Sequence, residues 1–131
     1  MHNAKPTIVL VDDSAAMRTF FEQVALEADF ELHAYASAEA SLAFLDNNRP
    51  SLLVINVMMP NKDGYSLLKQ LRANPLHQDT PTVMISSKDY AQDRVAAKEL
   101  GVLEFVAKPI SKKALRSLIE HYVDAGGGPR E

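Results

Sequence analysis

Polar side chains that could bind a metal ion and an anion follow four apolar runs of this 131-residue chain. Asp12 and Asp13 come after the first run, and Asn56, Ser86 and Lys108 each come after a later one. Two carboxylates, a hydroxyl and an ammonium describe a site for a hard divalent cation, and Mg²⁺ suits such oxygen ligands best. At this site Lys108 would neutralise a bound phosphoryl group, and Ser86 would donate a hydrogen bond to it.

Five short segments are predicted to be the strands that position these residues. Four of them are continuous apolar runs, as expected of strands buried on both faces of a parallel sheet. The fifth, 31–35, alternates between apolar and polar residues like an edge strand with one wetter face. In chain order the segments are 7–11, 31–35, 52–55, 82–85 and 103–107.

Segments of helical period lie between the strands, and each begins with a residue suited to start a helix. The start residues are Ser14, Ser37, Asp63, Asp89 and Ser111. The third helix is expected to stop near Asn74-Pro75, the fourth at Gly101 and the fifth near Val123. The first helix is predicted to carry one apolar face. That face would consist of Met17, Phe20, Phe21, Val24 and Leu26.

Alternation of strands and helices predicts an α/β fold with right-handed crossovers. We expect a flavodoxin-like (βα)5 three-layer sandwich with a parallel five-stranded sheet in the order 2-1-3-4-5. Ligands of such sheets bind beyond the carboxyl ends of the strands, so the polar residues above are expected to converge on one crevice. We predict a single domain over residues 1–125 and a flexible tail or linker start over residues 126–131.

Composition narrows the function classes. The formal net charge of -3 provides no broad positive field for nucleic acid, so protein partners fit better. The chain has no cysteine, which excludes disulfides, thiol catalysis and thiolate metal sites. The first apolar run is too short for a signal-peptide core or a membrane span. We therefore expect a cytoplasmic protein that is bound neither to nucleic acid nor to a membrane.

Several of these residues also have simpler interpretations. The acid pair Asp12-Asp13 could cap the first helix, and Asn56 could be a turn residue that hydrogen-bonds local backbone. Phe105 is either an ordinary core residue or part of the site. The histidines lack metal-ligand spacing, and we interpret all of them as surface or edge residues. They are His2, His33, His77 and His121.

From about Lys5 to Val123 the chain resembles the receiver domain of response regulators, which is CheY-like. The resemblance rests on several motifs that occur in order on the expected elements. These motifs are Asp12-Asp13 after the first strand, the segment 58–64 (Met-Met-Pro-Asn-Lys-Asp-Gly) after the third, Ser86 at the end of the fourth, and Phe105 before Lys108-Pro109 in the fifth. The resemblance implies a receiver domain of a two-component phosphorelay. Such a domain is a switched protein-interaction module and not a turnover enzyme.

The resemblance also implies a role for each motif residue. Asp12, Asp13 and the backbone carbonyl of Met58 would hold Mg²⁺, with Asn56 in the same ligand set. A second group would respond to a phosphoryl group. In that group Ser86 would be the switch hydroxyl, Phe105 the aromatic residue whose rotamer follows it, and Lys108 the partner of the phosphoryl oxygens. The Lys108-Pro109 bond is typically cis in this family.

Asn56 departs from the family pattern, which has a phosphate-accepting aspartate at this position. A neutral amide oxygen is a poor nucleophile, so ordinary phosphotransfer should fail. The lost negative charge should also weaken Mg²⁺ binding, although an amide oxygen can still be a ligand. Two origins fit equally well: a natural pseudo-receiver, or an Asp-to-Asn substitution made in the laboratory.

The resemblance implies partners on both sides of the pathway. A sensor histidine kinase or a phosphotransfer protein would act upstream. A downstream protein target would bind the face made by the fourth helix, fifth strand and fifth helix, about residues 90–122. One alternative is a constitutive, phosphate-independent protein-binding adaptor in which the pocket is a remnant. Another is a flavodoxin-like binder of FMN, but two acids occupy the turn where a phosphate cradle would be expected.

Overall fold

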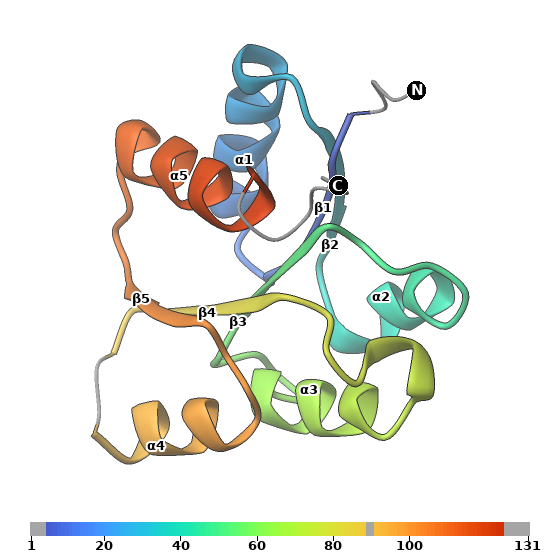
Figure 1. Ribbon diagram of the computed structural model, residues 1–131. Coiled ribbons are helices and arrows are strands. Elements are labelled where there is room, and N and C mark those ends of the chain that lie inside the picture. The colour runs from blue at the N-terminus through green and yellow to red at the C-terminus, as the bar shows by residue number, and fades with distance from the viewer. Residues whose placement is uncertain (1–4, 89–90, 125–131) are drawn as a thin grey trace.

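Five parallel strands form one sheet in the order β2-β1-β3-β4-β5 (Figure 1). The computed structural model describes residues 5–88 and 91–124, so His2, the predicted helix start at Asp89 and the predicted tail 126–131 lie outside the described residues. The strands are β1 (Thr7–Val11), β2 (Glu31–Tyr35), β3 (Leu52–Asn56), β4 (Thr82–Ser86) and β5 (Glu104–Ala107). Their order confirms the flavodoxin-like fold predicted from the sequence.

Helices cover both faces of the sheet, with α1 and α5 on one face and α2, α3 and α4 on the other (Figure 1). The α-helices are α1 (Ala15–Ala28), α2 (Ala38–Leu45), α3 (Gly64–Arg72), α4 (Ala91–Glu99) and α5 (Lys112–Ile119). A short 3-10 helix, η1 (Pro75–His77), follows α3, and a π-helical turn, η2 (Glu120–Asp124), continues α5. Four predicted N-caps are confirmed, because each side chain accepts a backbone N–H from the first turn. These caps are Ser14, Ser37, Asp63 and Ser111.

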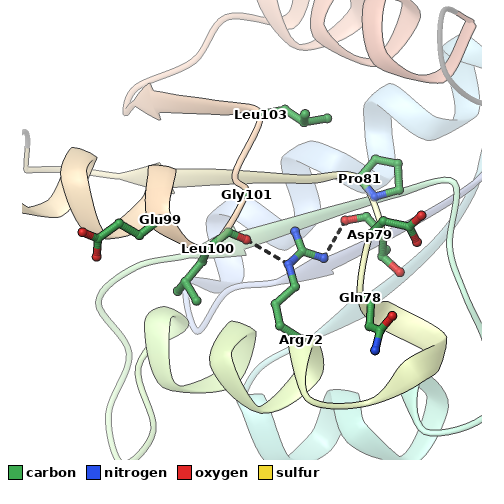
Figure 2. Close-up of a pocket in the computed structure, with 9 residues that line it drawn as sticks. Arg72, Gln78, Asp79, Pro81, Glu99, Leu100, Gly101 and Leu103 are labelled. Atoms are coloured by element: carbon green, nitrogen blue, oxygen red, sulfur yellow. Dashed lines mark hydrogen bonds between the residues drawn. The ribbon is translucent and has the colours of Figure 1, made fainter.

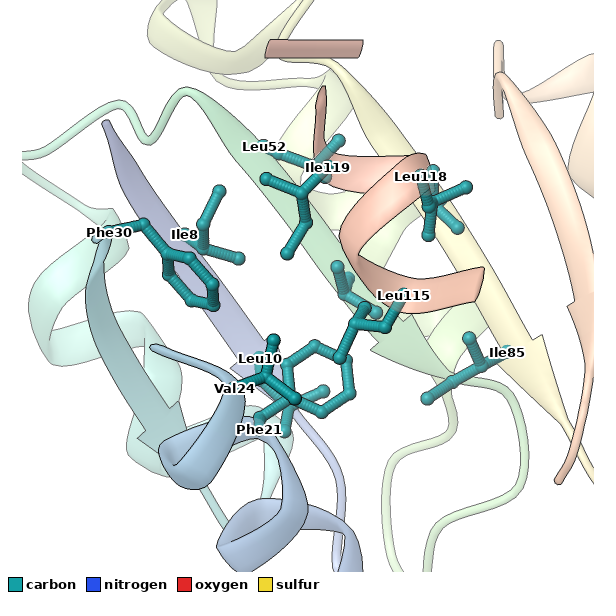
Figure 3. Packing of buried hydrophobic residues seen from close by; sticks show 12 residues of the cluster. Ile8, Leu10, Phe21, Val24, Phe30, Leu52, Ile85, Leu115, Leu118 and Ile119 are labelled. Atoms are coloured by element: carbon teal, nitrogen blue, oxygen red, sulfur yellow. The ribbon is translucent and has the colours of Figure 1, made fainter. Parts of the chain in front are cut away.

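Two hydrophobic clusters lie on opposite faces of the sheet because successive side chains of a strand point to opposite sides. The first cluster joins the strands to α1 and α5 (Figure 3). Its strand members are Ile8, Leu10, Leu52, Val54, Val83 and Ile85. The second cluster joins the strands to α2, α3 and α4, and its strand members are Val9, Val11, Leu53, Ile55 and Met84. Burial on both faces explains why these strands are continuous apolar runs.

Two predictions about individual side chains are wrong. Leu26 was expected on the apolar face of α1, but it is 88% exposed. It follows Val24 by two residues, which rotates it by about 200° around a helix and away from the sheet. His77 was expected at the surface but is fully buried, with Nε2 2.6 Å from the carbonyl oxygen of Leu45 and Nδ1 2.9 Å from Thr80 Oγ1. Histidine spacing that does not suit metal binding gives no information on whether a histidine is buried.

Candidate functional site

The acidic end of β1 and the residue after β5 meet at the carboxyl edge of the sheet. Asp12 is fully buried, and its Oδ2 lies 2.9 Å from the Nζ of Lys108. No group of the described residues makes a hydrogen bond of normal geometry to this oxygen. The ion pair with Lys108 therefore offsets the cost of burying its charge. Asp12 Oδ1 accepts the backbone N–H of Ser14 at 2.9 Å, and Arg18 Nη1 donates to the Asp12 carbonyl at 2.9 Å. The contact of Arg18 was not predicted.

Asn56, the last residue of β3, lies at the same edge of the sheet, and we call the group of Asp12, Asp13, Asn56, Met58 and Lys108 the crevice. Its side-chain nitrogen donates to Asp13 Oδ1 at 3.2 Å and to the carbonyl oxygen of Met58 at 2.8 Å. Only 5% of Asn56 is exposed. The structure therefore brings Asp12, Asp13, Asn56 and Lys108 together, as the sequence predicted for the carboxyl ends of the strands.

Gly64 allows the chain to turn closely past Asn56 after β3. Its N–H donates to the carbonyl of Val57 at 2.9 Å. A Cβ added at Gly64 would lie 2.5 Å from the carbonyl oxygen of Asn56 and 2.9 Å from Ile55 Cγ2. The backbone of α3 can thus approach the end of β3 only because residue 64 lacks a side chain.

Gly64→Ala is therefore expected to lower the free energy of unfolding by about 2–3 kcal/mol, since backbone must move to relieve the overlap. Urea denaturation measures this change, with Ser66→Ala on the exposed face of α3 as the control. A loss below about 0.5 kcal/mol would contradict the close packing described here.

Ser86 and Phe105 contact the crevice less directly. Ser86 is fully buried at the end of β4, where its Oγ accepts the N–H of Lys88 at 3.1 Å and its carbonyl accepts the N–H of Lys108 at 2.7 Å. Phe105 is partly buried against the second cluster, and the guanidinium of Arg94 lies 5.1 Å from the centre of its ring. The Lys108-Pro109 bond is cis, as predicted. The switch roles of Ser86 and Phe105 stay predictions.

The oxygen atoms of the crevice have the right chemistry for Mg²⁺, because two carboxylates and a carbonyl are hard ligands. Within residues 5–88 and 91–124, however, no group of three or more His, Cys, Asp or Glu side chains could hold a metal ion. The fit is therefore partial: Asp12, Asp13 and the Met58 carbonyl can supply ligands, and the remaining ligand is the amide of Asn56. Magnesium binding here stays a prediction.

A hollow of about 550 Å³ lies at the opposite edge of the sheet, and Arg72 is one of the residues that line it (Figure 2). The guanidinium donates at 2.9 Å to each of three backbone carbonyls, and it also approaches Thr82 Oγ1 at 3.4 Å. Those carbonyls belong to His77, Thr80 and Leu100. Burial lowers the pKa of Arg72. Because its donors are used on the chain's own carbonyls, Arg72 is structural, a role that was not predicted from the sequence.

Two tyrosine hydroxyls form hydrogen bonds to α4 and β5. The hydroxyl of Tyr65 on α3 donates to the carbonyl of Asp93 on α4 at 2.7 Å. The hydroxyl of Tyr122 donates to Glu104 Oε1 on β5 at 2.7 Å. Burial and nearby acids raise the pKa of Tyr65 to about 12, and burial and Glu104 do the same for Tyr122.

These raised values predict a loss of stability at high pH. Both hydroxyls stabilise the fold while protonated, so their contribution is complete below pH 10, the ordinary pKa, and is lost as pH rises through about 12. Urea denaturation between pH 9 and 12 should show this decline for the chain and a shallower decline for Tyr65→Phe and Tyr122→Phe. Lysine deprotonation affects all three proteins alike, so equal slopes would contradict the prediction.

The fold and the acidic crevice define a protein of the receiver class, and comparison with known proteins agrees. Residues 8–120 match the model of the response regulator receiver domain family. The chain therefore belongs to this family and is a receiver domain of two-component signalling. The matched range lies within the predicted domain 1–125, whose limits stay predictions.

Individual relatives support the same assignment. The chain is 34% identical over 119 residues to the probable transcriptional regulator ycf27 of Porphyra purpurea, covering 91% of this chain and 48% of that protein. The chain thus spans about half the length of this relative.

No helix among the described residues is long and apolar enough to cross a membrane.

Solved structures share the fold at lower identity. Chemotaxis protein CheY4 of Vibrio cholerae superposes with a TM-score of 0.85 at 22% identity, covering 91% of this chain and 99% of that one. The receiver domain of sensor histidine kinase PA1611 from Pseudomonas aeruginosa gives 0.82 at 20% identity, covering 92% and 98%. That structure carries a magnesium ion coordinated in its active-site cleft.

Proposed function

We propose that this receiver domain signals through protein contacts without accepting a phosphoryl group, because Asn56 stands at the phosphoacceptor position. The observation that carries the proposal is the place of Asn56 at the carboxyl end of β3, in hydrogen-bond contact with Asp13 and Met58 and beside the Asp12–Lys108 ion pair. An acceptor carboxylate would attack phosphorus and become an acyl phosphate. An amide oxygen is too weak a nucleophile for this step.

The surrounding residues would keep the roles that the family pattern gives them. Asp12, Asp13 and the Met58 carbonyl are the oxygen atoms that the family pattern assigns to Mg²⁺, and any binding there would be weaker than with an aspartate at position 56. When bound, Mg²⁺ would neutralise negative charge in the crevice. In a relative that accepts a phosphoryl group, the lysine at the position of Lys108 would pair with the phosphoryl oxygens.

A second group of residues would form the switch. Ser86 would supply the switch hydroxyl, and Phe105 would supply the aromatic ring that moves with it. Support for Ser86 comes from its position at the end of β4, where its carbonyl accepts the N–H of Lys108. Phe105 lies on β5 at the border of the second cluster, so its ring is only partly enclosed.

The partners would be proteins. A sensor histidine kinase or a phosphotransfer protein would act upstream, and a downstream target would bind the face formed by α4, β5 and α5. Two exposed apolar side chains support this face, since Val95 on α4 is 58% exposed and Leu103 before β5 is 50% exposed. Exposed apolar side chains mark a protein interface when they form a contiguous patch.

A constitutive adaptor is the second candidate function. It is favoured by the Asp12–Lys108 ion pair and the Asn56 hydrogen bonds, which satisfy the crevice with groups of the chain itself. The test pairs the chain with its Asn56→Asp variant, each incubated with Mg²⁺ and a small-molecule phosphodonor, and compares intact masses. The proposal requires that the unaltered chain gains no phosphoryl group.

A further inference from the structure

We infer that the Asn56 amide nitrogen and the Lys108 ammonium take the place of a divalent cation, so that this crevice is complete without Mg²⁺. This goes beyond the proposed function, because a receiver that lacks the acceptor carboxylate can still bind Mg²⁺ through its other oxygen ligands.

Four oxygens that could bind a cation here already have either a hydrogen-bond donor or a cationic partner from the chain. Asp12 Oδ1 accepts the Ser14 N–H at 2.9 Å, and Asp12 Oδ2 lies 2.9 Å from Lys108 Nζ. Asp13 Oδ1 and the Met58 carbonyl both accept hydrogens from Asn56 Nδ2, at 3.2 and 2.8 Å. Magnesium would have to replace these donors and also lose part of its own water shell, which it releases reluctantly.

The direction of the Asn56 amide follows from its neighbours. An amide carries two donor hydrogens at its nitrogen and only acceptor sites at its oxygen. If the amide were turned over, its oxygen would face Asp13 Oδ1 and the Met58 carbonyl, and three acceptors would repel one another. Only a cation among them would make that orientation favourable, so cation binding and the hydrogen bonds seen here exclude each other.

An aspartate at position 56 could not do the same. It has no N–H to offer when ionised, so Asp13 and Met58 would face another negatively charged group. The crevice would then depend on an external cation, because Lys108 is the single basic side chain seen to pair with these acids in the described residues. Asparagine therefore contributes a donor pair that the family's acceptor residue lacks.

The experiment measures Mg²⁺ binding by the chain, by Asn56→Asp, and by Asn47→Asp, which makes the same charge change at an exposed site. Thermal denaturation is followed from zero to about 10 mM MgCl₂, with NaCl added to equal ionic strength. The chain and Asn47→Asp are expected to show no shift in melting temperature. Asn56→Asp is expected to gain about 3–5 °C at saturating Mg²⁺ and to bind it about tenfold or more tightly.

A second readout follows the Asn56 side chain itself. In a ¹⁵N-labelled chain, the side-chain NH₂ resonances of Asn56 should keep their positions as MgCl₂ is added, since the two hydrogen bonds persist. The inference is overturned if these resonances move with a dissociation constant similar to that of Asn56→Asp. It is also overturned if Asn56→Asp fails to bind Mg²⁺, because the amide would then not be what excludes the metal.

The two proposals fail separately. Tight Mg²⁺ binding by the unaltered chain overturns the inference about the amide but leaves the chain unable to accept a phosphoryl group. A phosphoryl adduct on the unaltered chain overturns the proposed function, whatever the Mg²⁺ titration shows.

Discussion

Asn56→Asp is expected to convert a chain that takes up no phosphoryl group into one that does. The substitution supplies the missing carboxylate nucleophile at the end of β3. The other groups needed are already in place, since Asp13 lies 3.2 Å from the side chain of residue 56 and Lys108 lies 2.9 Å from Asp12. Incubation with Mg²⁺ and a small-molecule phosphodonor, followed by intact mass measurement, should show an acid-stable, base-labile adduct on the variant alone.

Asn47→Asp is the matched control, because it adds a carboxylate at an exposed site outside the crevice. If neither protein gains an adduct, the crevice is a remnant and the constitutive adaptor becomes the better account. If Asn56→Asp alone gains one, Asn56 by itself keeps the crevice inactive, which favours a recent or engineered loss of the aspartate. An adduct on the unaltered chain would refute the central proposal, with deamidation of Asn56 or another acceptor as its source.

Arg72→Met should be the most destabilising of the substitutions considered, by about 3–5 kcal/mol. Methionine keeps much of the aliphatic volume but leaves three carbonyls without their charged donor. These carbonyls lie in η1, in the entry to β4 and in the turn after α4, so one side chain joins all three to the end of α3. Urea denaturation at neutral pH measures the change in the free energy of unfolding.

Arg49→Met provides the comparison for this prediction. Arg49 donates to Asp79 Oδ1 at 2.7 Å in an exposed ion pair, and such pairs contribute about 0–1 kcal/mol. The two variants lose the same charge, so only burial and the number of bonded carbonyls distinguish them. Equal losses in the free energy of unfolding for both variants would show that the Arg72 hydrogen bonds stabilise the fold no more than an exposed ion pair does.

The fold was predictable because its signals are local. Continuous apolar runs identify buried parallel strands, and Ser14, Ser37, Asp63 and Ser111 mark helix starts through bonds within one turn. The strand order then follows from the rules for right-handed crossovers together with the usual order of such sheets. The gathering of the site residues followed as well, since the carboxyl ends of parallel strands meet at one edge.

The details that escaped prediction depend on contacts between distant segments. The sequence around Arg72 gives no indication that its side chain donates to the carbonyl of Leu100. Similarly, His77 is buried where its ring contacts the carbonyl of Leu45 at the end of α2. The direction of the Asn56 amide likewise depends on Asp13, which lies 43 residues away in the chain. Patterns of residue type report exposure and turn geometry, but they carry no information on which distant acceptor a side chain meets.

The division of the core into two clusters has a consequence for how this protein can change over evolutionary time. The sheet backbone separates the side chains that meet α1 and α5 from those that meet α2, α3 and α4. A change of side-chain volume at Val54 is therefore met by repacking against α1 and α5, whereas a change at the adjacent Leu53 is met in the opposite layer. The core side chains of one helical layer can thus change while the packing and the outer surface of the other layer stay the same.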